Sequence, residues 1–289
     1  MSNVSITSIK IKKRKSSIAK MGIQSKIIIG IFITIVILFY VYPILNLVNV
    51  SFKTSMQFMI DPIGLSKQFN FSNYAKVFVQ GHFLRNFYNS ISYLFFSNIL
   101  VLSITSLAAF VISRKYIRFA GFFYVLFLAG MFLPDPLIPQ FILMRKLNLY
   151  NTPIGYIFTR TNPGVIMLLM TGYYRTLPKS LDEAAVLDGC GMLRYITFFI
   201  VPMSKPVFAS AFILFSVGVW NDIVGTTVFL TSPQYFPVIR ALFAFRGVYG
   251  NDWPPLAAAV FIVASPLIII FLIFQKYIVG GMVAGGVKG

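Results

Sequence analysis

Six long apolar runs limit this chain to few folds, because about 20 apolar residues in a helix cross the hydrocarbon core of a bilayer. The runs cover Ile27–Val50, Phe87–Ser113, Phe119–Met144, Ile154–Tyr174, Val207–Leu230 and Leu256–Ile278. Only 11% of the 289 residues are charged, whereas about a quarter of a soluble domain is charged. The sequence therefore predicts an all-α, polytopic membrane protein with six transmembrane helices.

Two of these runs contain residues that interrupt a helix. The fourth is interrupted by Arg160-Thr161-Asn162-Pro163-Gly164, so we expect its continuous helix to begin near Pro163, a good first-turn residue. In the third, prolines 134, 136 and 139 surround Asp135. A water-lined cavity tolerates such a break at membrane depth.

The basic residues indicate the orientation of the chain in the membrane. The net charge of +18 comes from Lys and Arg that lie between the apolar runs, which is typical of a positive-inside bias rather than of nucleic-acid binding. With the N-terminus inside, these cations divide roughly two to one in favour of the cytoplasm. We expect residues 1–26 to form a basic cytoplasmic N-terminus, residues 27–279 the six-span domain and residues 280–289 a glycine-rich cytoplasmic tail.

Residues 180–202 form a polar segment between the fourth and fifth runs. Ser180 and Glu183 have capping-box spacing, Asp188-Gly189 is a turn signal, and a second helix is expected from Met192 to Ile200. The sequence predicts two short cytoplasmic helices. Their surface suits either docking of a soluble partner or adsorption of an amphipathic loop to the inner leaflet.

Several motifs of this chain resemble those of ABC-importer permease subunits. Glu183-Ala184-Ala185, followed by Gly189 and Pro202, resembles their EAA loop, although Phe199 and Val201 replace the usual isoleucine and leucine. The segments that resemble carbohydrate-importer permeases of the MalG-like type are Tyr173–Pro178, Leu147–Thr152, Trp220-Asn221-Asp222 and the ending 275–289. Ordered motifs of this kind are more specific than the three-residue EAA match alone.

The resemblance implies partners and roles for particular residues. The ATPase-docking residues would be Glu183, Ala184, Ala185, Asp188, Gly189 and Pro202. The tail, with Gly280, Gly281, Gly285 and Gly286, would reach the ATPase interface. The resemblance also implies a second permease subunit, two cytoplasmic ABC ATPase subunits and an extracellular or periplasmic solute-binding protein, in a bacterial cell membrane. No Gly-x-x-x-x-Gly-Lys-Ser/Thr phosphate loop occurs in the sequence, so ATP and Mg²⁺ are expected on the partner subunits and no cofactor on this chain.

Polar residues within the apolar runs are candidates for the substrate path. Trp220, Asn221 and Asp222 combine an aromatic face with amide and carboxylate groups, as sugar sites do. Helix–helix hydrogen bonding is the alternative explanation, preferred here for Asp222, whereas a path role is preferred for Asn221. Asp135 suits either a translocation path or a solvated acid near the outer interface, paired with Arg145.

The leading hypothesis is therefore a permease subunit that imports an oligosaccharide or a related carbohydrate and is not itself an enzyme. One alternative is a permease for another solute, such as an amino acid or peptide. Another is an intramembrane enzyme that uses Asp135 and Asp222, and a third is a membrane-anchored scaffold. No catalytic residue is assigned, and neither is a metal site, because the chain has a single cysteine, Cys190, and a single histidine, His82.

Overall fold

A computed structural model describes residues 23–247 and 250–286 of the chain. Within these ranges the protein is helical apart from one short hairpin, in which β1 (Arg246–Gly247) pairs antiparallel with β2 (Gly250–Asn251). The prediction of an all-α protein is confirmed. Most of the predicted basic N-terminus, residues 1–22, lies outside the described residues.

Three stretches are long and apolar enough to cross a membrane. They are Gln24–Ser51, α5 (Phe83–Arg114) and Trp253–Ile273, which is the first part of α15 (Trp253–Gly286). The first stretch consists of α1 (Ile23–Val36), a π-helical turn η2 (Ile37–Val41) and α2 (Tyr42–Ser51). They correspond to the first, second and sixth predicted spans.

The other three predicted spans are each divided in two, so among the described residues three helices, or four if the bent pair Met192–Met203 and Lys205–Trp220 counts as one span, are long and apolar enough to cross a membrane. The third run forms α6 (Ala120–Gly130) and α7 (Leu137–Lys146), the fourth α8 (Pro153–Thr159) and α9 (Gly164–Thr176), and the fifth α13 (Lys205–Trp220) and α14 (Ile223–Phe229). At 1.5 Å per residue, each of these helices is shorter than the roughly 30 Å hydrocarbon core.

Each division has a local cause. Three prolines interrupt the third run, and Pro163 immediately precedes α9, close to the predicted helix start. In the fifth run, the Asp222 side chain accepts a hydrogen bond from the Gly225 amide at 2.8 Å and so caps a new helix, α14. The first two breaks follow signals seen in the sequence, whereas the third was not expected.

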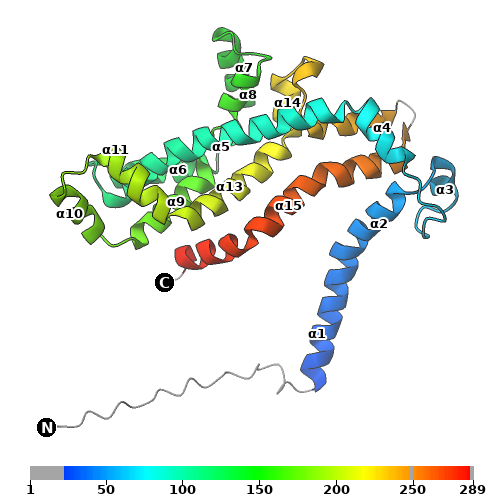
Figure 1. Cartoon of the computed structure of the whole chain (residues 1–289), viewed down its shortest axis with the longest axis horizontal. Coiled ribbons are helices and arrows are strands. Elements are labelled where there is room, and N and C mark those ends of the chain that lie inside the picture. Colours follow the sequence, from blue (N-terminus) through cyan, green and yellow to red (C-terminus); the bar gives the residue numbers. More distant parts are fainter. Residues whose placement is uncertain (1–22, 248–249, 287–289) are drawn as a thin grey trace.

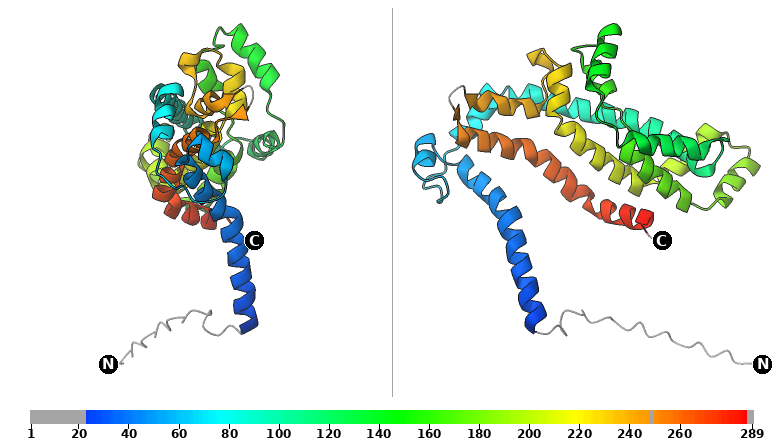
Figure 2. Two further views of the ribbon diagram at one scale, coloured as in Figure 1. Left: turned by 90° about the vertical axis from the view of Figure 1, so that its right-hand side faces the viewer. Right: turned by 180° about the vertical axis from the view of Figure 1, so that it is seen from behind.

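The helices form an elongated bundle with distinct ends. Figure 1 shows α5, α9, α13 and α15 running along its length, with α10 (Ser180–Leu187) and α11 (Met192–Tyr195) at one end. At the other end lie α3 (Ser55–Ile60) and α4 (Ser72–Gln80). The second halves of the divided runs, α7, α8 and α14, rise from the side of the bundle, while α1 stands apart from it in every view (Figures 1 and 2).

Two clusters of buried side chains hold the bundle together. The cluster nearer α4 contains Trp220, Tyr156, Tyr93 and Phe229, among others. The cluster nearer α10 is built around Phe110 and includes Tyr174, Tyr195, Ile196 and Met170. The remaining elements connect these helices: a π-helical turn η3 (Ile196–Ile200), α12 (Val201–Met203), and the 3-10 helices η4 (Pro233–Tyr235) and η5 (Val238–Phe245).

Candidate functional site

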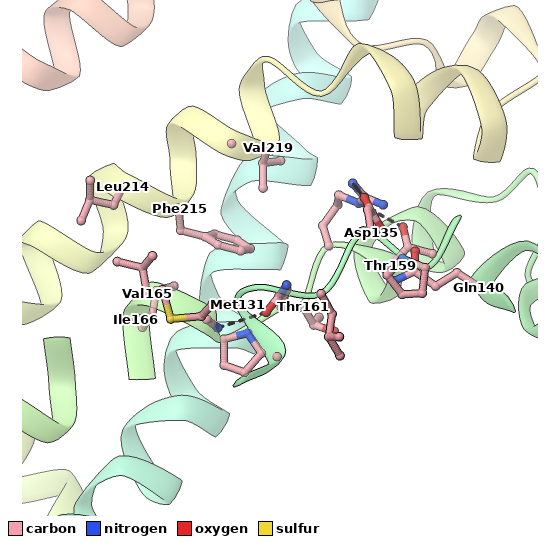
Figure 3. Close-up of a pocket in the computed structure, with 18 of the residues that line it drawn as sticks. Met131, Asp135, Gln140, Thr159, Thr161, Val165, Ile166, Leu214, Phe215 and Val219 are labelled. Carbon is pink, nitrogen blue, oxygen red and sulfur yellow. Dashed lines mark hydrogen bonds and ion pairs between the residues drawn. The ribbon is translucent and has the colours of Figure 1, made fainter. Parts of the chain in front are cut away.

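A cavity of about 830 Å³ lies where the three divided runs break. Its walls come from residues 130–136 after α6, residues 158–166 between α8 and α9, Gln140 of α7, and residues of α13 (Figure 3). The first residue of α9 is about 18 Å along the helix from Thr176. The cavity, lined by the first residues of α9, therefore lies at the opposite end of that helix from the segment that leads to α10.

An ion cluster centred on Arg160 joins the three broken runs. Its Nη1 lies 3.1 Å from Asp222 Oδ2 and 3.6 Å from Asp135 Oδ2. The side chains of Arg160 and Asp222 are 13% and 10% exposed, whereas that of Asp135 is 50% exposed. The guanidinium also lies 5.9 Å from the ring centroid of Tyr156 and 5.8 Å from that of Phe229. Arg160 thus carries a charge that is buried, paired and stacked on aromatic rings.

Close packing fixes the geometry of this cluster. The Tyr156 hydroxyl donates a hydrogen bond of 2.9 Å to Asp222 Oδ2, and the Tyr156 ring packs edge-on against Tyr93 of α5. Gly225 lies where the neighbouring atoms leave no room for a side chain. A Cβ there would collide with the Asp222 carboxylate and approach Arg160 Cζ to 3.0 Å. The carboxylate therefore keeps one position between α8 and α14.

The structure brings two of the predicted path residues together and separates the others. Asp135 and Asp222 converge on one guanidinium. Asn221 is exposed and its amide donates back to Val217 O at 3.0 Å. Trp220 points away from the cavity into the core, where its Nε1 donates to Val263 O of α15 at 3.0 Å.

Arg160 has no role in the sequence-based expectations. The partner expected for Asp135 is Arg145, but its ion pair is with Arg160. A lone arginine inside an apolar run was the available signal, because charges at membrane depth usually pair or face a cavity. Among the described residues no group of three or more His, Cys, Asp or Glu side chains is placed to hold a metal ion.

The polar segment forms two short helices, as predicted, joined by a turn at Gly189. Gly189 has φ +66, a left-handed conformation that favours glycine. The predicted capping box does not form, because Ser180 is already the first helical residue of α10 and Lys179, which precedes it, makes no side-chain cap. The second helix continues through η3 and α12 and meets α13 at a bend of 82°.

A buried ion pair attaches this segment to the bundle. Arg114, the last residue of α5, places Nε 2.8 Å from Asp182 Oδ2, with side chains only 3% and 12% exposed. Arg114 Nη1 also donates to Leu177 O at 3.0 Å. The Tyr195 hydroxyl of α11 donates to Asp182 Oδ1 at 2.7 Å. One carboxylate therefore connects α5, α10 and α11.

The predicted docking residues divide between an exposed face and a packed face. Glu183, Ala184, Asp188, Gly189 and Pro202 are exposed, whereas Ala185 packs against the buried cluster nearer α10. Large apolar side chains also lie on the exposed face: Val186, Leu187 and Leu193. The segment thus presents an apolar surface that its own chain leaves uncovered.

The predicted glycine tail continues a helix. α15 extends through Gly280, Gly281, Gly285 and Gly286, and the last three residues of the chain lie outside the described ones. This end of α15 lies toward the α10 end of the bundle (Figure 1).

These features define a helical membrane protein in which divided helices surround a charged cavity and a polar two-helix segment is exposed at one end. Residues 74–283 match the family described as the binding-protein-dependent transport system inner membrane component, and the chain belongs to that family. The resemblance to carbohydrate-type ABC permeases is confirmed by its relatives.

Two curated relatives and one solved structure illustrate the match. The trehalose/maltose transport system permease protein MalG of Thermococcus litoralis is 31% identical, with 86% of this chain and 91% of the relative covered. The arabinooligosaccharides permease protein AraQ of Bacillus subtilis is 29% identical, with 91% and 96% covered. A chain of a bacterial ABC transporter that imports the acidic polysaccharide alginate has a TM-score of 0.77 at 22% identity, covering 91% of this chain and 98% of that one. The last match shows a shared fold.

Proposed function

We propose that the chain is one of two permease subunits of a bacterial ABC importer for an oligosaccharide or a related carbohydrate. The charged cavity at the three helix breaks is the observation that carries this proposal. Discontinuous helices commonly form substrate sites in transporters, since their free backbone groups face the solute. The sugars named for several relatives, such as trehalose, maltose and arabinooligosaccharides, support a carbohydrate as the solute.

In this proposal the α10–α11 segment docks the ATPase. Its exposed apolar side chains belong to the end of the bundle toward which the C-terminal part of α15 runs (Figure 1), so the docking segment and the glycine tail would meet the same partner. ATP and Mg²⁺ would be bound by two ATPase subunits, and the solute would arrive from an external binding protein. Six membrane crossings, with both termini in the cytoplasm, complete the proposed topology.

The alternatives suggested by the sequence are less well supported. An enzyme that uses Asp135 and Asp222 would need carboxylates that can exchange a proton, but the Arg160 guanidinium is ion-paired with both. The sugar names among the relatives do not favour an amino acid or a peptide as the solute. A scaffold leaves the cavity without a role.

Docking can be tested by comparing two matched variants of the assembled transporter. Leu187 on α10 and Leu65 at the opposite end of the bundle are 87% and 84% exposed. We expect Leu187→Asp to abolish co-purification of the ATPase with the tagged permease, since it places a charge in an apolar contact. Leu65→Asp should leave co-purification at the wild-type level.

The docking proposal predicts different ATPase recovery in the two variants. ATPase recovery that is equal in both variants would refute docking through α10, and adsorption of this segment to the inner leaflet would then explain its exposed side chains. Binding-protein-stimulated ATP hydrolysis in proteoliposomes, together with uptake of the sugar, tests the transport function as a whole.

A further inference from the structure

We infer that the cavity at the helix breaks binds the hydroxyl groups of uncharged saccharides and discriminates against saccharides that carry carboxylates. The inference rests on the proposed function and adds to it a substrate class that this subunit selects. The observations behind it are the charge of the cluster, the half-exposed Asp135 carboxylate at the cavity wall and the aromatic side chains there.

The charge of the site follows from the pairing of Arg160. Among the lining residues, the charged ones are Asp135 and Arg160. With Asp222, which lies behind Arg160, the cluster holds two carboxylates and one guanidinium. The arginine is therefore more than neutralised, and one negative charge remains. It is carried closest to the cavity by Asp135, whose side chain is half exposed.

The Asp135 carboxylate is a polar group of this wall that a saccharide can reach. Its side chain is half exposed and belongs to the cavity lining. A carboxylate accepts hydrogen bonds from the hydroxyl groups of a sugar. Arg160 Nη2 and Gln140 Oε1 belong to lining residues too, but both atoms are buried from solvent. The wall thus provides an accessible acceptor for sugar hydroxyls.

The rest of the wall suits the apolar faces of a saccharide. Phe158 near the end of α8 and Phe215 of α13 both line the cavity. Apolar and aromatic walls with a few polar groups are typical of small-molecule sites. A volume of about 830 Å³ lies within the usual range for such sites, about 300–1,000 Å³.

A carboxylated saccharide would meet a like charge in this site. For charges about 8 Å apart in an effective dielectric of about 20, the repulsion corresponds to roughly 30-fold weaker binding. Neutral saccharides do not experience this repulsion. Removing the charge of Asp135 should therefore strengthen the binding of a carboxylated saccharide and leave that of a neutral one unchanged, so the ratio of the two affinities falls.

The experiment uses the complete transporter with Cys190→Ala and a reporter cysteine at Val165, a half-exposed lining residue. The rate of maleimide labelling is measured against rising concentrations of neutral di- and trisaccharides, including maltotriose, and of trigalacturonate. We expect a neutral saccharide to slow labelling at concentrations about 30-fold lower than trigalacturonate does. In Asp135→Asn this ratio should fall to about 3-fold or less, and in the control Asp252→Asn it should stay unchanged.

Each other result overturns the inference. Equal protection by trigalacturonate in the wild type would remove the charge discrimination, and the absence of protection by every neutral saccharide would remove the site. An unchanged ratio of the two protecting concentrations in Asp135→Asn would mean that a group other than Asp135 discriminates against the carboxylates. If the ATPase co-purifies and hydrolysis responds to the binding protein in the same preparation, the proposed function stands even when this inference fails.

Discussion

The ion pair between Arg114 and Asp182 should determine the stability of the two-helix segment. Replacing Asp182 with asparagine keeps the size of the side chain and an oxygen that can accept from Tyr195, but it removes the negative charge. Arg114, only 3% exposed, would keep a buried charge without its partner. Its Nη2 already has no hydrogen-bond partner among the described residues.

The size of the effect can be estimated from the geometry. At 2.8 Å and an effective dielectric of about 20, the attraction is about 6 kcal/mol before desolvation is subtracted. Breaking a buried pair by removing one partner typically costs about 3–5 kcal/mol. Asp182 is 12% exposed, so we expect the lower end, about 3 kcal/mol. This corresponds to a roughly 100-fold increase in local opening.

Hydrogen exchange measured by mass spectrometry on the purified transporter reports this opening directly. Amides of α10 should exchange about 100-fold faster in Asp182→Asn, while those in the middle of α5 should keep their wild-type rates. Asp188→Asn is the control, because Asp188 is exposed on the same segment and such surface changes usually alter stability by less than about 0.5 kcal/mol. An increase below about 3-fold, or an equal increase throughout α5, would refute the reasoning.

Three further changes have expected outcomes. Gly189→Ala should lower the free energy of local unfolding of the segment by about 1 kcal/mol, measured by hydrogen exchange, because alanine is strained at the Gly189 φ of +66. Trp220→Phe should destabilise the bundle by about 1–2 kcal/mol in a thermal melt, because Val263 O loses its donor. The Gly64 amide lowers the pKa of Asp61, so this turn should be most stable above the ordinary pKa of 3.8 and lose that contribution as the pH falls through the lowered value. The protection factor of the Gly64 amide, which corrects the exchange rate for the intrinsic pH dependence of exchange, should show the loss, and Asp61→Asn should abolish the pH dependence of that factor.

These outcomes can each be contradicted. A Gly189→Ala variant as stable as the wild type would mean that the turn relaxes without strain, and an unchanged melting temperature for Trp220→Phe would mean that water replaces the indole N–H. A protection factor at Gly64 with the same pH dependence in Asp61→Asn would assign the titration to another group.

The sequence predicted the helical class, the polar two-helix segment and the breaks at proline. Long apolar runs and turn residues are local signals, and they identified α5, α15 and the turn at Gly189 correctly. The division of the fifth run was not predicted. The mean hydropathy of the run stays high despite Asn221 and Asp222, and it contains no information on the ability of Asp222 to cap a new helix.

The ion cluster could not be derived from any local pattern. Asp135, Arg160 and Asp222 lie on three separate runs, and their convergence depends on how α8, α9, α13 and α14 pack. Trp220 shows the opposite limitation. Its type suited a sugar face, but the rotation of α13 directs it towards Val263 in the core, and only tertiary structure sets that rotation.

Helix α5 remains unbroken over 32 residues, so a displacement at one of its ends can be transmitted to the other. Arg114 fixes one end to the two-helix segment, and Tyr93 contacts the ring of Tyr156 beside the ion cluster. The two positions are separated by about 31 Å along the helix axis. A tilt of about 5° around Arg114 would move Tyr93 by nearly 3 Å, about the length of a hydrogen bond. If the two-helix segment and α5 move as one body, a rocking of that size displaces Tyr93 relative to Tyr156 and the ion cluster beside it.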